Sequence, residues 1–305
     1  MRYGTILILL LVTVSSGCGG GNSASGPGRP APFGVSADHV LVVVLENHGF
    51  SQVIGSPAMP YLNSLGTQHA LAANYFADTH PSIGNYFVLT VGAVESNDDA
   101  FAGTVADNNI VRVMTAASRT WKGYIESLPS QGYTGPDTGL YTKHHNPFAY
   151  MSDTLNSAAQ AANMVNFTQL ASDLNAASLP AFSLIVPNNQ NNAHDCPGGT
   201  ATCLDTDKLT AADIWLQTNI DPVITNPKFG NSVLIILWDE SLATDTANGG
   251  GQVAVVMVGP QVKTAFRSST FFQHRSTLRL VLNLLGIDNI PNAAASAPSM
   301  REFFQ

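Results

Sequence analysis

The chain carries four short, continuously apolar runs that are rich in Val, Ile and Leu. They cover residues 39–45, 183–186, 232–237 and 253–258. Apolar runs of this length without polar alternation are typical of strands buried on both faces of a sheet. The pattern therefore predicts four buried strands.

Around these runs, apolar residues recur with the spacing of amphipathic helices. We expect helices near 59–69, 105–118, 168–178, 207–225 and 274–286. Because strands alternate with helices, the pattern predicts an α/β fold with a mainly parallel sheet sandwiched between helices. We expect this body to form one domain over residues 38–305.

The first 37 residues have a different pattern. Arg2 precedes an apolar stretch over 5–14, and small residues follow it, which is the organisation of a secretory signal peptide. We predict a signal peptide over 1–18 and a flexible linker rich in Gly, Ser and Pro over 19–37. Cys18 leaves two alternatives open: a lipid anchor of the bacterial lipoprotein type, or cleavage without lipidation.

Export predicts a periplasmic, cell-envelope or secreted location, and it bears on the two remaining cysteines. Cys196 and Cys203 lie close together in the sequence, and an oxidising compartment favours a disulfide between them. Closing so short a loop would stabilise the protein by roughly 2.5 kcal/mol. The alternative is a pair of thiolate metal ligands, although the sequence contains no CxxC partner pair.

Composition narrows the range of binding partners. The 305 residues include 13 Lys and Arg against 21 Asp and Glu, for a net charge of −8. This balance argues against nucleic acid, whose binders present dense positive charge. The apolar fraction of 45% excludes disorder for the body. Membrane contact is expected only through a lipid anchor at Cys18. The composition leaves the oligomeric state open.

Polar side chains follow three of the predicted strands. Glu46 and Asn47 come directly after the first strand, Asp239 and Glu240 follow the third, and the second leads to His194. Because ligands bind at the carboxyl ends of parallel strands, these groups are expected at one site. The oxygen donors suit Ca²⁺, Mg²⁺ or Mn²⁺. The alternative is that Asp239 and Glu240 point to opposite sides and one caps a helix.

A second group of candidates lies in the segment 79–86. Ser82 follows Pro81 and precedes a helix expected to begin near Asn85. A hydroxyl at a helix amino terminus is well placed to attack an anion held by the backbone N–H groups. The alternative is an ordinary helix cap, and Thr79 is a second hydroxyl candidate.

Two histidine-containing segments remain, at 143–148 and 194–195. Loop histidines are commonly solvated or bonded to backbone, so a role for His145 or His194 competes with that interpretation. A zinc site built from histidines is a weaker hypothesis, because no HxxxH or HExxH spacing occurs on a helix.

Six short motifs occur in a fixed order between about residues 40 and 290. They are Leu45-Glu46-Asn47-His48, Thr79-His80-Pro81-Ser82 with Asn85-Tyr86, Trp121-Lys122-Gly123-Tyr124, His145-Asn146-Pro147-Phe148, His194-Asp195-Cys196 and Trp238-Asp239-Glu240. Together they resemble the phosphoesterase family of bacterial and fungal acid phosphatases and phospholipases C, in the alkaline phosphatase superfamily.

The resemblance implies a role for each matching residue. Four residues are implied as metal ligands: Glu46, Asn47, Asp239 and Glu240. Ser82 is implied as the nucleophile, with Thr79 in reserve because Gly84 stands where the family pattern has Pro. His145 and His194 are implied to bind phosphate or assist the leaving group, and Asn85 to bind phosphate through its amide.

The function expected from the resemblance is metal-assisted hydrolysis of small phosphorylated substrates, as in an acid phosphatase acting on phosphomonoesters. A phosphodiesterase or phospholipase C is the alternative, but the stretch after Glu240 lacks the Gly-Gly-aromatic-Asp-His pattern of the phospholipases. A non-catalytic cell-surface binding lipoprotein is the alternative from another class.

Overall fold

The computed structural model describes Met1 and residues 33–305. The predicted signal peptide, Cys18 and most of the predicted linker lie outside the described residues, so these remain predictions. Within residues 33–305, no helix combines the length and apolar character needed to cross a membrane.

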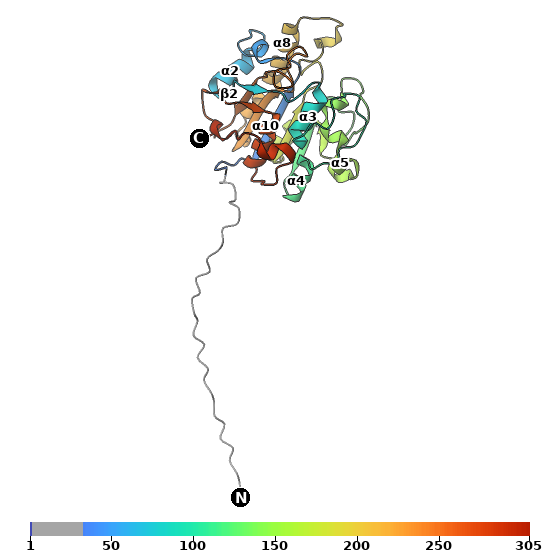
Figure 1. Ribbon diagram of the computed structural model, residues 1–305, viewed down its shortest axis with the longest axis vertical. Helices are drawn as coiled ribbons and strands as arrows, with labels where there is room; N and C mark the ends of the chain where they lie inside the picture. The colour runs from blue at the N-terminus through green and yellow to red at the C-terminus, as the bar shows by residue number, and fades with distance from the viewer. Residues whose placement is uncertain (2–32) are drawn as a thin grey trace. The chain divides into compact units, whose positions relative to one another are not determined.

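The body is built on an eight-stranded sheet (Figure 1). In spatial order its strands are β5 (Met164–Asn166), β4 (Trp121–Ile125), β6 (Phe182–Val186), β1 (His39–Leu45), β7 (Ser232–Trp238), β8 (Val255–Val258), β2 (Ala70–Ala72) and β9 (Phe266–Ser268). The pairings are parallel except where β8 meets β7 and β2. The predicted mainly parallel α/β fold is therefore confirmed.

All four predicted strands are present, as β1, β6, β7 and β8. The first three are adjacent at the centre of the sheet, where β1 lies between β6 and β7. Every side chain of β6 and β7 is buried, which explains their continuous apolar sequences. β8 begins at Val255 rather than at 253, because the N–H of Val253 donates instead to the carbonyl of Tyr75.

The sequence pattern missed β4 and the shorter strands, including the separate pair β3 (Tyr75–Phe76) and β10 (Phe272–Gln273). β4 contains Lys122, which interrupts its apolar run. The Lys122 ammonium forms an ion pair with Asp173 at 2.5 Å, and this contact compensates its charge beside the sheet.

The helices lie between the strands. They are α1 (Phe50–Val53), α2 (Pro60–Gln68), α3 (Ser82–Val91), α4 (Ile110–Ala116), α5 (Ser152–Leu155), α6 (Ala158–Ala161), α7 (Gln169–Asn175), α8 (Asp205–Asn219), α9 (Asp221–Ile224) and α10 (His274–Leu284). Figure 1 shows α3 and α10 in front of the sheet, where they pack against each other, and α2 packs against α8.

Three helix predictions need correction. The helix expected from 105 begins only at Ile110, because the Asn109 side chain caps it by accepting from the N–H of Arg112. The helix expected over 207–225 is two helices, α8 and α9, with Pro222 in the first turn of the second.

The third correction concerns α3, which begins at Ser82 rather than near Asn85. Pro81 takes the cap position in extended conformation, and the helix starts at the next residue. All ten residues of α3 are buried. The helix is therefore fixed from its first residue onward, and so is the hydroxyl that this residue carries.

Candidate active site

The adjacent carboxyl ends of β1 and β7 bring two acidic side chains together. The strands pair in register up to Leu45 and Trp238, so the residues that follow, Glu46 and Asp239, leave the sheet side by side. Both side chains are fully buried. The backbone N–H of Asn47 donates to Asp239 Oδ1 at 3.1 Å and fixes that carboxyl group.

Ser82 faces this pair of carboxyl groups. Its Oγ donates to Glu46 Oε2 at 3.1 Å, and the cap position of α3 belongs to Pro81, so Ser82 is the first helical residue and not the cap. One turn later on the same helix face, the Tyr86 hydroxyl donates to Glu46 Oε1 at 2.6 Å. Two hydroxyl groups of α3 thus hold the Glu46 carboxyl group between them.

The reserve hydroxyl candidate points elsewhere. Thr79 Oγ1 donates to the carbonyl of His80 at 3.2 Å and to Asn97 Oδ1 at 3.0 Å. Both partners lie in the turn before α3 or in the loop after it. The geometry therefore favours Ser82 over Thr79 as the hydroxyl that faces the acidic residues.

The two candidate histidines lie next to each other, and His145 contacts Glu46. His145 Nε2 lies 3.5 Å from Glu46 Oε1, and the ring stacks on Tyr86 at 5.3 Å between centroids. The ring centroid of His194 is 5.6 Å from that of His145. Residues from β1, α3 and two separate loops thus form a single cluster.

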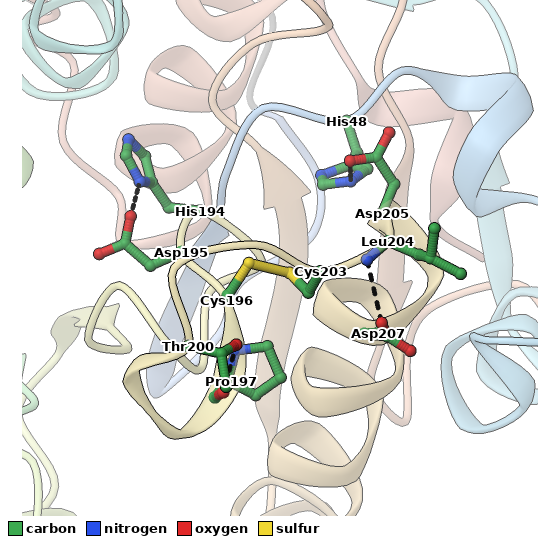
Figure 2. Close-up of a disulfide and its surroundings, with 10 residues drawn as sticks. All are labelled: His48, His194, Asp195, Cys196, Pro197, Thr200, Cys203, Leu204, Asp205 and Asp207. Atoms are coloured by element: carbon green, nitrogen blue, oxygen red, sulfur yellow. Dashed lines mark hydrogen bonds and ion pairs between the residues drawn. A yellow bond between two sulfur atoms is a disulfide. The ribbon is translucent and has the colours of Figure 1, made fainter.

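The two histidines differ in their surroundings. His145 is fully buried, and burial, helped by the neighbouring His144, lowers its pKa well below the usual value. His194 is one-third exposed, and its Nδ1 lies 2.7 Å from Asp195 Oδ1. Figure 2 shows this His194–Asp195 pair beside the disulfide of the same loop.

That disulfide joins Cys196 to Cys203, with Cα atoms 5.7 Å apart. It ties the segment after His194 to Leu204, the residue that precedes α8. On the other side of the bridge, His48 Nε2 lies 4.0 Å from Asp205 Oδ1 (Figure 2). The loop that positions His194 is therefore anchored to α8.

Glu240 and Asn85 form a second contact region beside the first. Glu240 Oε2 lies 3.1 Å from His80 Nδ1 and accepts from Asn85 Nδ2 at 3.4 Å. The Asn85 amide also donates to the carbonyl of Thr79, and its oxygen accepts from the N–H groups of Asp78 and Thr79. Asn85 thus holds the turn before α3, and its expected role in phosphate binding remains a prediction.

Burial makes the three carboxyl groups weak acids. It raises the pKa of Glu46 well above the ordinary range, with the charge of Asp239 as the next cause. It raises the pKa of Glu240 to about 9, again followed by the charge of Asp239. Burial also raises the pKa of Asp239. Three neighbouring carboxylates stay ionised together only when positive charge lies close to them, and the side chains of this cluster do not supply it.

The expected divalent cation can be judged against these groups. Within the described residues, no group of three or more His, Cys, Asp or Glu side chains is arranged to hold a metal ion. Glu46 and Asp239 nevertheless converge, and Asp239 Oδ2 is buried without a hydrogen-bond partner. Such an oxygen and the hard carboxylate donors fit Ca²⁺, Mg²⁺ or Mn²⁺. The cation and its four-residue ligand set remain predictions.

A comparison with protein families identifies the kind of chain that carries this cluster. Residues 56–288 match the model of the phosphoesterase family. The chain belongs to the phosphoesterase family. The predicted resemblance is confirmed, and the phosphoesterase is a phosphoric ester hydrolase.

Relatives of this phosphoesterase carry phosphatase names. It is 27% identical to a phosphatidylinositol-3-phosphatase of Mycobacterium tuberculosis, over 85% of this chain and 81% of the relative. It is 28% identical to a phosphate-repressible acid phosphatase of Penicillium chrysogenum and 25% identical to a probable acid phosphatase of Kluyveromyces lactis. These matches cover 80% and 81% of this chain but only 58% of each relative, so the chain spans less than two thirds of these fungal proteins.

Solved structures share the fold at low sequence identity. A protein of the alkaline phosphatase superfamily from Vibrio parahaemolyticus matches with a TM-score of 0.63 at 11% identity, over 85% of this chain and 69% of that one. A lipoteichoic acid synthase, LtaP, of Listeria monocytogenes matches with a TM-score of 0.59 at 10% identity, over 87% and 80%. These matches establish an alkaline-phosphatase-like fold.

Sequence reasoning gave no role to two residues that contact the site of this phosphoesterase, Tyr86 and His80. The signal for Tyr86 was available, because it follows Ser82 by four residues and so shares its helix face. The contact between His80 and Glu240 had no such signal, since the two residues are far apart in the sequence.

Proposed function

We propose that this phosphoesterase is a metal-assisted acid phosphatase that hydrolyses phosphomonoesters with Ser82 as its nucleophile. The observation that carries the proposal is the orientation of the Ser82 hydroxyl, which donates to Glu46 at the buried end of the central strands. Ser82 is not the cap of its own helix, because Pro81 takes the cap position and Ser82 is the first helical residue.

The proposed cation site consists of the Glu46 and Asp239 carboxyl groups, with Asn47 and Glu240 completing the ligand set. A divalent cation bound there would offset the negative charge of the carboxylates, polarise a phosphoryl oxygen and favour ionisation of Ser82. The unpartnered Asp239 Oδ2 supports this assignment, because a buried carboxylate oxygen otherwise needs a donor.

The covalent chemistry is assigned to Ser82. Its Oγ attacks phosphorus while the bond from phosphorus to the ester oxygen breaks, which leaves a phosphoserine. The hydroxyl proton leaves along the existing hydrogen bond to Glu46. Water then attacks the phosphoserine, Ser82 regains its proton, and inorganic phosphate is released.

His194 is the proposed acid for the leaving alcohol. Asp195 binds its Nδ1, which orients the ring and leaves Nε2 for the ester oxygen. In the second step His194 takes a proton back from the attacking water. His145 is better suited to hold the Glu46 carboxyl group, because burial lowers its pKa and keeps its imidazole neutral, and its Nε2 lies 3.5 Å from Glu46 Oε1.

Two observations favour a monoesterase over the phosphodiesterase or phospholipase C. The relatives reported above are named phosphatases, and the stretch after Glu240 lacks the phospholipase pattern. A binding lipoprotein without catalysis would have no use for a hydroxyl held against two carboxyl groups.

The test is turnover of p-nitrophenyl phosphate and bis(p-nitrophenyl) phosphate by the wild type, Ser82→Ala and Thr79→Ala. We expect the monoester to be the better substrate and Ser82→Ala to lose on the order of 10³-fold in kcat. Thr79→Ala should cost far less, because its hydroxyl points away from the carboxyl groups. Preference for the diester, or full activity of Ser82→Ala, would contradict the proposal.

A further inference from the structure

The segment 96–101, here called the strap, lies across the first turn of α3. The chain leaves α3 at Gly92 and returns so that the ring of Phe101 packs on Phe87 of the same helix, with centroids 5.9 Å apart. Phe101 also packs on Tyr150 at 5.7 Å. These aromatic contacts fix one end of the strap on the helix.

The other end of the strap approaches α3 closely, and Gly84 permits this approach. A Cβ atom at position 84 would collide with Asn97 Oδ1 of the strap and with Thr79 Cγ2, and it would lie 3.2 Å from the carbonyl oxygen of Ser96. Asn97 also accepts the hydrogen bond from the Thr79 hydroxyl. The replacement of the family's Pro by Gly84 therefore allows the strap to sit on the amino end of the helix.

Asp99 is the charged residue that the strap brings to this helix end. Its Oδ1 accepts from the backbone N–H of Ile83 at 3.2 Å. Ile83 is the second residue of α3 and directly follows Ser82, so its N–H lies in the first turn, where a helix attracts anions. The carboxylate thus occupies the place at which a phosphoryl oxygen would meet the helix.

Asp99 also faces the rest of the cluster. Its charge contributes to the raised pKa of Glu240, after burial and the charge of Asp239. The buried Asp239 Oδ2, which lacks a hydrogen-bond partner, belongs to the same group of acidic residues. A phosphoryl group bound at Ser82 would therefore meet the negative charge of Asp99.

We propose that the Asp99 carboxylate competes with a phosphoryl group for the N–H of Ile83 and so limits how tightly the site holds inorganic phosphate. The inference rests on the proposed function, because it takes Ser82 as the point where the phosphoryl group binds. Free inorganic phosphate, the product, would use the same N–H as the phosphoryl group of the ester. Asp99 thereby weakens retention of the product.

The test compares Asp99→Asn with Asp98→Asn. The first variant keeps the side-chain shape and an acceptor oxygen for Ile83 but removes the charge. The second removes a charge one residue earlier, where the carboxylate is exposed and caps Ala100 in the same loop. The dissociation constant of inorganic phosphate is measured by calorimetry, and its inhibition of p-nitrophenyl phosphate hydrolysis is measured alongside.

We expect Asp99→Asn to bind phosphate about tenfold more tightly, because a like charge close to the anion is removed. Asp98→Asn should stay within about twofold of the wild type, since its exposed charge is screened by solvent. Unchanged or weaker phosphate binding by Asp99→Asn would overturn the proposal.

Gly84→Ala provides a second variant, which reaches Asp99 through the strap. Its added methyl group would collide with the side chains of Asn97 and Thr79 and crowd the carbonyl oxygen of Ser96. We expect the strap to shift and carry Asp99 with it, so phosphate should again bind more tightly. Combining it with Asp99→Asn should give less than the product of the two effects, because both act through one contact. Full multiplication of the effects, or no effect of Gly84→Ala, would count against the strap.

The outcomes separate this inference from the proposed function. A protein that binds phosphate as expected but hydrolyses no ester would refute the proposed function and leave Asp99 as a competitor for the anion. A protein that hydrolyses monoesters with a phosphate affinity insensitive to Asp99 would refute the inference alone.

Discussion

At the scale of single residues, the site is dominated by buried acid groups whose protons are held tightly. Glu46 and Asp239 were foreseen from their places after two apolar strands, and the register of β1 with β7 explains why they meet. Glu240 is expected in the same ligand set, and its carboxyl group also contacts His80 and Asn85, which the sequence pattern did not predict. Side-chain direction at the end of a strand is set by contacts across the fold, which the sequence pattern does not contain.

These raised pKa values predict how stability depends on pH. In the unfolded chain the carboxyl groups lose their protons near pH 4. In the folded, metal-free protein they keep their protons to higher pH. Between about pH 5 and pH 9 the folded state thus binds more protons than the unfolded chain. The upper limit is set by Glu240, whose pKa is raised to about 9. Stability should therefore fall as pH rises, by about 1.4 kcal/mol per pH unit for each proton of difference.

Thermal unfolding in EDTA between pH 5 and pH 8 measures this slope. Adding Mg²⁺, Ca²⁺ or Mn²⁺ should raise Tm at pH 8 far more than at pH 5, because the carboxyl groups must lose their protons to bind the cation. Asp239→Asn is the matched variant and should lose most of the response. A Tm that is independent of pH, or equally sensitive to the cation at both values, would argue against the metal site.

At the scale of elements, the loop between β6 and α8 contains a disulfide next to His194, the proposed acid. The disulfide between Cys196 and Cys203 follows His194 directly and ends at the start of α8 (Figure 2). The cysteine pairing could be predicted from spacing and export. The contact of His194 with His145 could not, since it depends on how two distant loops pack.

Replacing both cysteines by serine should weaken the fold and loosen His194. We expect the unfolding free energy to fall by roughly 2.5 kcal/mol through the lost loop constraint. Turnover of an alkyl phosphate should fall several-fold, while p-nitrophenyl phosphate, whose leaving group needs little protonation, should change less.

His194→Asn serves as the comparison for the disulfide variant. Its turnover should fall in the same pattern but by a larger factor, on the order of 10²-fold for the alkyl phosphate and less for p-nitrophenyl phosphate. If both variants affect the two esters equally, the loop does not act through protonation of the leaving group.

At the scale of the whole molecule, the fold was predictable because its three central strands carry uninterrupted apolar sequences. β1, β6 and β7 are buried on both faces, and this leaves a signal that survives without tertiary information. Strands of two or three residues, such as β2 and β3, depend on their partners and leave no such signal.

The start of α3 shows where prediction from sequence ended. Pro81 predicts a boundary, but only the fold shows that the helix begins at the next residue and directs Ser82 at Glu46. The close approach of the strap at Gly84 was equally hidden, since it joins residues through space rather than along the chain.

The central claim is that Ser82 takes the phosphoryl group from a monoester. The most direct measurement is rapid-quench trapping with a radiolabelled phosphomonoester, followed by mapping of the labelled peptide. We expect label on Ser82 in the wild type and none in Ser82→Ala. Label on Thr79, or Ser82→Ala that still turns over with no phosphoenzyme formed, would contradict it.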